Sequence, residues 1–185
     1  VIADEVYAAL TYDRDPTGMA TLVDDSEHVI TIGSCSKAYA MTGWRVGWLA
    51  TESSVVDETT KIRESTTAST PTPSQHAAIA ALEGPQAPVR EMQTAFRERR
   101  DYVTDRLAEM DGVKASRSQG AFYAFLDPEG YDDSTALAKA LVTEAGVVFA
   151  PGAGFGDAGE GKLRLSYANS LDRLETGLDR LDAYL

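Results

Sequence analysis

One short segment of the sequence combines a primary amine, hydroxyl groups and a guanidinium group. It spans residues 34–48 and reads SCSKAYAMTGWRVGW. Ser34, Lys37 and Arg45 lie in it among small and turn-forming residues. A lysine amine forms a Schiff base with an aldehyde, while a hydroxyl group and an arginine fork bind phosphate oxygens. These residue types therefore favour a phosphorylated aldehyde as the ligand.

Two predicted strands would position this segment. An alternating apolar run at residues 29–33, VITIG, predicts a β-strand that ends directly before Ser34. A second strand is expected over residues 1–7 and ends in Asp4-Glu5-Val6-Tyr7. Ligands of α/β proteins collect at the carboxyl ends of strands, so both endings are candidate site positions.

The segment resembles the lysine segment of the class I/II aminotransferases, which are fold type I enzymes that use pyridoxal phosphate. That family has a hydroxyl residue three positions before its Schiff-base lysine and an arginine eight positions after it, as Ser34, Lys37 and Arg45 are placed here. Residues 41–48, MTGWRVGW, are similar to the aspartate-aminotransferase-like branch. The resemblance implies that Lys37 holds the cofactor and transfers the substrate proton, and that Ser34 and Arg45 bind the cofactor phosphate. The surrounding Gly and Trp residues also predict an ordered, partly buried Arg45.

A second pair of residues matches the same family. It places an Asp-x-x-Tyr motif at a strand end before the lysine, and Asp4 and Tyr7 match that arrangement. A carboxylate beside the pyridine nitrogen favours its protonated form, because the ion pair stabilises the charge. The resemblance thus implies that Asp4 contacts the cofactor nitrogen and that Tyr7 contacts its 3-oxygen.

A third candidate, Arg164, lies far from these residues in the sequence. It occurs in the alternating run GKLRLSY at residues 161–167, which follows PGAGFG at residues 151–156. Alternation predicts a strand whose arginine projects away from its leucine neighbours. The resemblance implies that Arg164 binds the α-carboxylate of the substrate, because an arginine fork can hold a carboxylate through two hydrogen bonds.

The order of the predicted elements indicates an α/β fold. The resemblance implies that residues 1–84 are the C-terminal part of a large pyridoxal-phosphate-binding domain with a mixed, mostly parallel sheet. Residues 85–185 would then be a linker helix and a small α+β domain. Ser74 is the expected N-cap of a helix over residues 76–82. The other expected helices cover residues 52–67, 88–110, 134–144 and 170–185, and the other expected strands lie within residues 46–50, 113–126, 147–150 and 163–167.

Composition limits the possible partners. The chain has 185 residues and a formal net charge of -12, with only five Lys against sixteen Asp. This balance argues against binding to a nucleic acid, whose phosphates need a basic surface. The same balance also suggests adaptation to high salt.

Cys35 is the single cysteine and is expected to be a small packing residue. Neither His28 nor His76 has the spacing of a metal site. No apolar run reaches membrane-spanning length, so a cytoplasmic enzyme is expected.

The resemblance also bears on the extent of the chain. Family members are roughly twice as long, so we interpret this sequence as a C-terminal half that forms a homodimer when full length. The predicted reaction is amino-group exchange between an amino acid, with aspartate or an aromatic amino acid as candidates, and a 2-oxo acid. Two alternatives stay open: a pyridoxal-phosphate-dependent lyase or synthase of the same fold, and an inactive truncated fragment.

Overall fold

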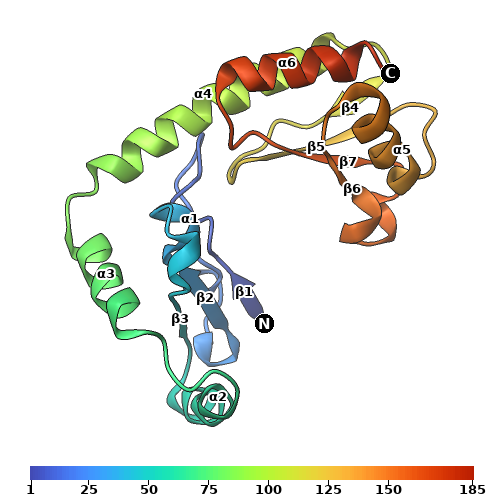
Figure 1. Ribbon diagram of the computed structural model, residues 1–185. Coiled ribbons are helices and arrows are strands. Elements are labelled where there is room, and N and C mark those ends of the chain that lie inside the picture. Colours follow the sequence, from blue (N-terminus) through green and yellow to red (C-terminus); the bar gives the residue numbers. More distant parts are fainter. The chain divides into compact units, whose positions relative to one another are not determined.

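A computed structural model describes residues 1–185, and it divides the chain into two compact units (Figure 1). The first unit is Val1–Gln93 and the second is Thr94–Leu185, so the division falls inside the long helix α4 (Ala87–Glu109). The boundary expected from the sequence, near Gly84, lies just before this helix. The assignment of the two segments to a large and a small domain stays a prediction. No helix combines the length and the apolar character needed to cross a membrane.

The first unit is built on a three-stranded mixed sheet in the order β1-β2-β3. The strands are β1 (Ile2–Asp4), β2 (Ile30–Ser34) and β3 (Gly47–Ala50). β1 runs parallel to β2, with Asp4 opposite Ile32, whereas β3 runs antiparallel to β2. The carboxyl ends of β1 and β2 therefore lie side by side.

β1 is shorter than the sequence predicts, because the chain turns directly after it. The amide of Ala8 donates to the carbonyl of Glu5 at 2.9 Å, and the amide of Leu10 donates to the carbonyl of Tyr7 at 2.8 Å. The expected strand to Tyr7 is therefore wrong beyond Asp4. Tyr7 lies in a tight turn that brings its side chain back toward the end of the sheet.

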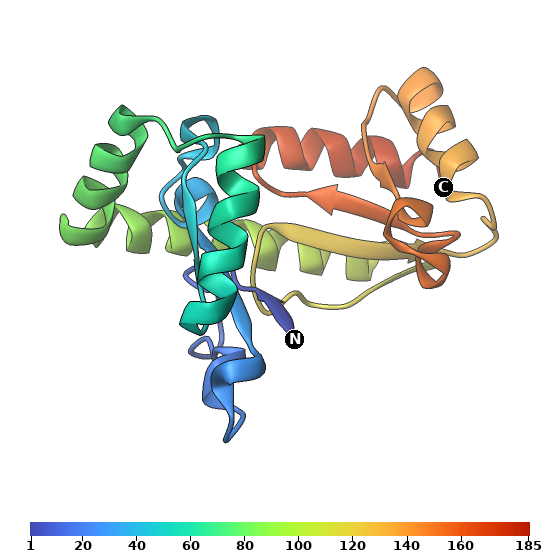
Figure 2. The ribbon, with the colours of Figure 1, turned by 90° about the horizontal axis from the view of Figure 1, so that it is seen from below.

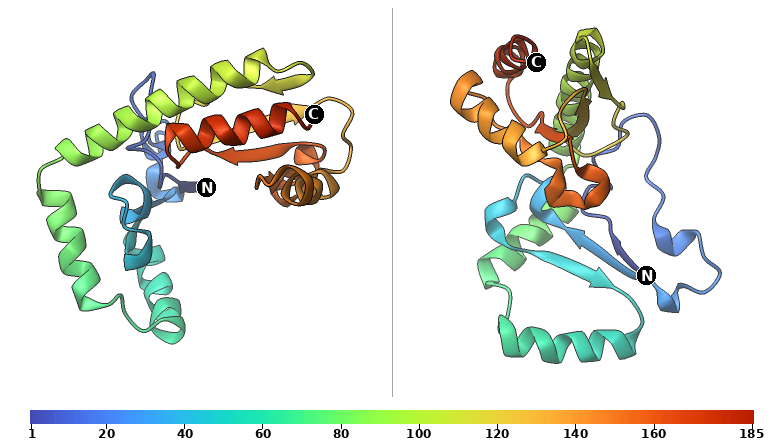
Figure 3. Two further views of the ribbon diagram at one scale, coloured as in Figure 1. Left: turned by 45° about the horizontal axis from the view of Figure 1, so that its top comes forward. Right: turned by 90° about the vertical axis from the view of Figure 1, so that its right-hand side faces the viewer.

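Besides the start of α4 and short 3-10 turns, the first unit holds the α-helices α1 (Cys35–Ala38), α2 (Ser53–Thr66) and α3 (Thr72–Glu83). α2 runs alongside β3 (Figure 3). α3 begins earlier than predicted, with Pro71 as its N-cap, so Ser74 is not the cap but a buried residue inside the helix. Pro73 fits the first turn of α3 because the amide that a proline lacks would have no partner there.

The second unit contains a four-stranded antiparallel sheet in the order β4-β5-β7-β6. The strands are β4 (Val113–Ala115), β5 (Tyr123–Pro128), β6 (Ala150–Pro151) and β7 (Leu163–Ser166). The strand predicted over residues 147–150 pairs only from Ala150 onward. The residues before it keep an alternating pattern of burial but have no partner strand.

Helices pack against this sheet because each presents one apolar face to it. α4 and α6 (Leu171–Asp182) lie side by side along one face (Figures 1 and 2), where Arg106 and Asp179 form an ion pair at 2.8 Å. α5 (Ser134–Ala140) lies by β6 and continues into a π-helical turn, Leu141–Ala145. The core residues that share full burial are Val103, Leu107, Leu126, Leu141, Leu163, Tyr167, Leu178 and Leu181.

Candidate active site

Lys37 follows β2 on the short helix α1, and its position depends on the hydroxyl of Ser34. The Ser34 hydroxyl accepts a hydrogen bond from the amide of Ser36 at 3.0 Å and donates one to the carbonyl of Val46 at 3.2 Å. Ser34 is thus the N-cap of α1 and also ties the end of β2 to the chain leading into β3. The cap ends the strand and places Lys37 one helical turn beyond it.

Lys37 lies close to the other motif of the first unit. Its Nζ atom is 5.8 Å from the centre of the Tyr7 ring. Asp4 is the last residue of β1, and its carboxylate accepts a hydrogen bond from the amide of Val6 at 3.3 Å. The structure therefore brings Asp4, Tyr7 and Lys37 together at the carboxyl ends of two adjacent parallel strands.

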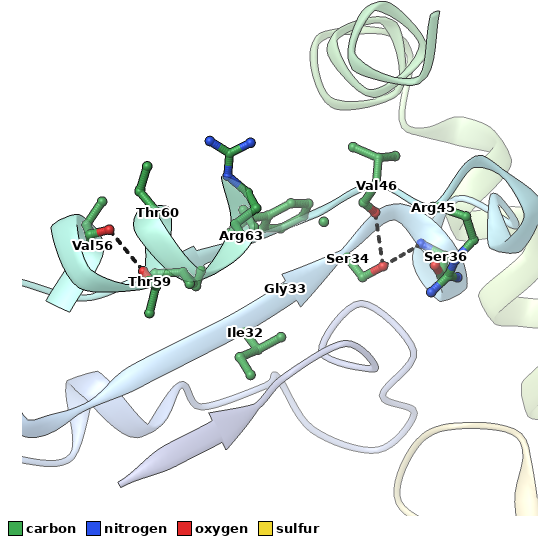
Figure 4. A pocket seen from close by; sticks show the side chains of 13 residues that line it. Ile32, Gly33, Ser34, Ser36, Arg45, Val46, Val56, Thr59, Thr60 and Arg63 are labelled. Carbon is green, nitrogen blue, oxygen red and sulfur yellow. Dashed lines mark hydrogen bonds between the residues drawn. The ribbon is translucent and has the colours of Figure 1, made fainter. Parts of the chain in front are cut away.

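Ser34 and Arg45 line a cavity of about 660 Å³ between β2, β3 and α2 (Figure 4). Arg45 adopts a left-handed backbone conformation with φ of 51°, and its Nη1 donates to the carbonyl of Thr42 at 3.0 Å. The lining of this cavity does not include Lys37, Tyr7 or Asp4. The five candidates of this unit thus form two groups, one around the lysine and one on the cavity wall.

Arg45 is exposed, so the prediction of a partly buried arginine is wrong. Trp44 and Trp48 are also exposed, by 47% and 44%. In the described chain, this segment adjoins β3, which has no neighbouring strand on its far side. The guanidinium of Arg45 nevertheless has a local partner in the carbonyl of Thr42.

Two residues close to Lys37 in the sequence serve packing. Cys35 is fully buried, and burial raises the pKa of its thiol, which keeps the thiol protonated and unreactive. The packing role expected of Cys35 agrees with this burial. Gly33 was not singled out by the sequence reasoning, yet a Cβ atom there would overlap the indole of Trp48. The sequence feature that marks Gly33 is its place inside a predicted strand, where a glycine often allows another group to approach the backbone closely.

Arg164 lies on β7 in the second unit, on the face away from the core. Leu163 and Leu165 are buried on either side of it in the sequence, which confirms the predicted orientation. Its guanidinium carbon is 4.3 Å from the centre of the Tyr123 ring and 4.3 Å from the centre of the Phe155 ring. Neither Tyr123 nor Phe155 was among the site residues predicted from the sequence. The sequence features that mark them are the aromatic residues of the strand predicted at residues 121–126 and the phenylalanine inside PGAGFG at residues 151–156.

Comparison with known proteins now identifies the family. Residues 1–181 match the family model for aminotransferase class I and II. The chain belongs to this family. The fold type I architecture expected from the lysine segment is therefore confirmed, and the family is one of pyridoxal-phosphate-dependent enzymes.

Similar proteins include enzymes with different substrates in their names. The chain is 34% identical to an aspartate aminotransferase of Bacillus subtilis and 36% identical to one of Thermotoga maritima, and both matches cover the whole chain. It superposes on the crystal structure of an aromatic aminotransferase from Pyrococcus horikoshii with a TM-score of 0.93, at 35% identity over the whole chain. The chain spans about half the length of these relatives, namely 49%, 47% and 50%.

Proposed function

We propose that this chain works in a pyridoxal-phosphate-dependent aminotransferase, which exchanges an amino group between an amino acid and a 2-oxo acid. The observation that carries the proposal is the meeting of Lys37 with Tyr7 and Asp4 at the ends of β1 and β2. The amine of Lys37 comes from one sequence motif, whereas the phenol of Tyr7 and the carboxylate of Asp4 come from another.

The functional groups in the first unit suit the parts of the cofactor. The amine of Lys37 suits its aldehyde, the carboxylate of Asp4 its pyridine nitrogen, and the phenol of Tyr7 its 3-oxygen. The guanidinium of Arg45 and the hydroxyl of Ser34 line one cavity and suit its phosphate, provided that the Ser34 hydroxyl turns its proton away from the carbonyl of Val46. When bound, pyridoxal phosphate supplies an electron sink that stabilises negative charge at the α-carbon of the amino acid.

The protein groups then have separate tasks. Lys37 is the general base that moves a proton at the substrate α-carbon, a role for which it must lie within hydrogen-bond reach of that proton. Asp4 keeps the pyridine nitrogen protonated through its negative charge. Arg164 binds the α-carboxylate of the amino acid and of the oxo acid, and so orients the substrate.

The names of the relatives support a choice of substrates. Relatives named for aspartate and for aromatic amino acids resemble this chain at nearly the same identity, 34–36%. Aspartate and the aromatic amino acids are therefore the substrates to test first. We also propose a homodimer and a cytoplasmic location for the complete enzyme.

The test is to identify the lysine that binds the cofactor. Borohydride reduction of the enzyme with pyridoxal phosphate, followed by peptide mapping, should place the adduct on Lys37. Lys37→Ala should remove the adduct and the transfer of an amino group from aspartate to a 2-oxo acid. Lys61→Ala is the matched control, because Lys61 is exposed on α2 and pairs with Glu58 at 2.6 Å. An adduct on Lys61 or Lys162 would contradict the assignment, and release of a cleaved product without amino transfer would indicate a lyase.

A further inference from the structure

Arg164 is held by two aromatic rings that come from different elements. Tyr123 belongs to β5, the strand paired with β7, and its ring centre lies 4.3 Å from the Arg164 guanidinium carbon. Phe155 belongs to the loop between β6 and β7, and its ring centre lies at the same distance. A cation stacked on aromatic rings is stabilised electrostatically and loses rotational freedom. The position of Arg164 therefore depends on how firmly each ring is held.

The sheet and a neighbouring aromatic residue fix the two rings to different degrees. Tyr123 is part of the β5–β7 ladder, opposite Ser166. Phe155 has no place in the sheet, although its ring packs edge-on against that of Phe125 at 5.9 Å. Its two sequence neighbours are Gly154 and Gly156, which have no side chains to anchor the loop. Other contacts must hold this loop in place.

A carboxylate and a buried hydroxyl supply these contacts. The Oε1 atom of Glu160 accepts hydrogen bonds from the amide and from the hydroxyl of Ser134, both at 2.8 Å, and from the amide of Gly161 at 3.2 Å. The Ser134 hydroxyl in turn accepts a hydrogen bond from the amide of Ala153 at 3.1 Å. Ser134 is fully buried at the start of α5. Residues from both ends of the loop are thus tied to one serine.

The ends of the loop also pack backbone against backbone. A Cβ atom on Gly152 would overlap the carbonyl oxygen of Gly159, and one on Gly159 would overlap that of Gly152. The amide of Gly152 donates to the carbonyl of Lys162 at 2.8 Å. Together with the Ser134–Glu160 connection, this closure ties down both ends of the loop that carries Phe155, whose side chain is 49% exposed.

We propose that Phe155 is a positioning residue for Arg164, and that the Ser134–Glu160 connection holds Phe155 against the guanidinium. The carboxylate-binding part of this inference rests on the proposed function of Arg164. A preoriented guanidinium loses less entropy when it binds a carboxylate, so the loop raises affinity for the substrate without touching it.

The first readout is substrate affinity in the complete enzyme. Phe155→Leu keeps an apolar side chain but removes the ring, and should raise the KM for amino acid and oxo acid about fivefold to tenfold, the size expected for one lost cation–ring contact. The change in kcat should be smaller than the change in KM. Phe155→Tyr should restore the normal KM, because it returns a ring. Val148→Ala serves as the control, since Val148 is 82% exposed and has no part in the loop.

The second readout needs no turnover. Nitrogen-15 NMR of arginine side chains measures rotation about the Nε–Cζ bond, and Arg164→Lys identifies the Arg164 signal by its loss. Rotation of the Arg164 guanidinium should be faster in Phe155→Leu and in Glu160→Ala than in the unaltered protein and in Val148→Ala. Glu160→Ala should also raise the KM, since it frees the loop without altering either ring.

The outcomes separate this inference from the proposed function. Unchanged rotation and an unchanged KM in Phe155→Leu would overturn the positioning role, even in an active aminotransferase. An equal rise of the KM in Phe155→Leu and Phe155→Tyr would overturn it too, because that result indicates packing alone. Faster rotation in Phe155→Leu in a protein that transfers no amino group would support the positioning of Arg164 and refute the proposed reaction.

Discussion

The amine of Lys37 lies 5.8 Å from the centre of the Tyr7 ring, although β2 and the long loop before it separate the two residues in the sequence. Parallel pairing of β1 with β2 causes this, because it puts the carboxyl ends of both strands at the same end of the sheet. The turn after Asp4 then directs Tyr7 back toward that end. Two motifs of moderate specificity thus become one group of side chains.

Removal of the Arg164 guanidinium should weaken substrate binding and spare cofactor binding. Loss of one partner of a desolvated charge pair costs about 2–5 kcal/mol, so Arg164→Leu should raise the KM for amino acids at least about 30-fold. Arg164→Lys should recover only part of this, because an ammonium group cannot form the paired hydrogen bonds. Arg173→Leu is the control, since Arg173 is exposed on α6. Reduced affinity for pyridoxal phosphate with an unchanged KM would show that Arg164 is structural.

A methyl group at Gly159 should destabilise the second unit. The new Cβ would overlap the carbonyl oxygen of Gly152, so the backbone would have to shift, at a cost of about 1–3 kcal/mol. Gly154→Ala is the matched control, because nothing lies within 4 Å of the added Cβ there. Chemical denaturation should show a lower free energy of unfolding for Gly159→Ala than for Gly154→Ala. Equal values for the two variants would contradict the close approach of the loop ends.

The connection from Glu160 to Ser134 should be sensitive to acid. Hydrogen bonds from the amide and the hydroxyl of Ser134, and from the amide of Gly161, lower the pKa of Glu160 below its usual 4.5. A lowered pKa in the folded state means that the stabilisation is complete above the unfolded pKa and is lost as the pH falls through the folded value. The Tm of the unaltered protein should therefore exceed that of Glu160→Gln at neutral pH.

The difference between these two Tm values is the quantity to follow in a pH series. It should stay constant down to about pH 4.5 and shrink below it, as Glu160 gains its proton and comes to resemble glutamine. Glu175→Gln, an exposed position on α6, reports the effect of removing one surface charge. A difference that grows as the pH falls would have the wrong sign for this connection.

The acidic surface predicts a response to salt. A net charge of -12 produces repulsion among carboxylates, and at 1 M salt the screening length falls to about 3 Å. If the composition reflects adaptation to high salt, the Tm should rise between low salt and molar potassium chloride. Potassium chloride is the salt to use, because sulfate stabilises folded proteins in general. A Tm that is flat or falling across the series would contradict the halophilic interpretation.

The 185-residue chain by itself should associate and should not transfer amino groups. β1 and β3 each have one edge without a partner strand, and unpaired edges invite pairing with other chains. Apolar side chains are exposed on both strands, including Ile2 by 69% and Leu49 by 38%. Size-exclusion chromatography at several concentrations, with absorbance of the cofactor recorded, measures the association.

A charged side chain on the unpaired edge strand β3 should reduce this association. Leu49→Lys places a lysine on β3, whereas Ile62→Lys places one on the exposed side of α2 and serves as the control. Only Leu49→Lys should shift the chain toward the monomer. A monomer at every concentration that carries cofactor and turns over amino acids would refute both parts of the prediction.

The sequence alone determined the local features of the site. The strand before the lysine segment followed from its alternating apolar residues, and β2 covers Ile30–Ser34. The direction of Arg164 followed from the alternation of its leucine neighbours, since successive side chains of a strand point to opposite faces. These features depend on neighbours within a few residues, so the order of residue types is sufficient to predict them.

Tertiary structure decided the features that depend on distant neighbours. Arg45 is exposed beside the outer strand β3 of the described chain, a setting that the glycine and tryptophan residues around it do not reveal. The end of β1 at Asp4 depends on which residues of β2 it pairs with. The rings around Arg164 come from residues 123 and 155, and they meet only because β5 pairs with β7 and Ser134 ties down the intervening loop. Burial, strand order and loop closure are set by contacts between segments far apart in the chain, and no local pattern of residues specifies them.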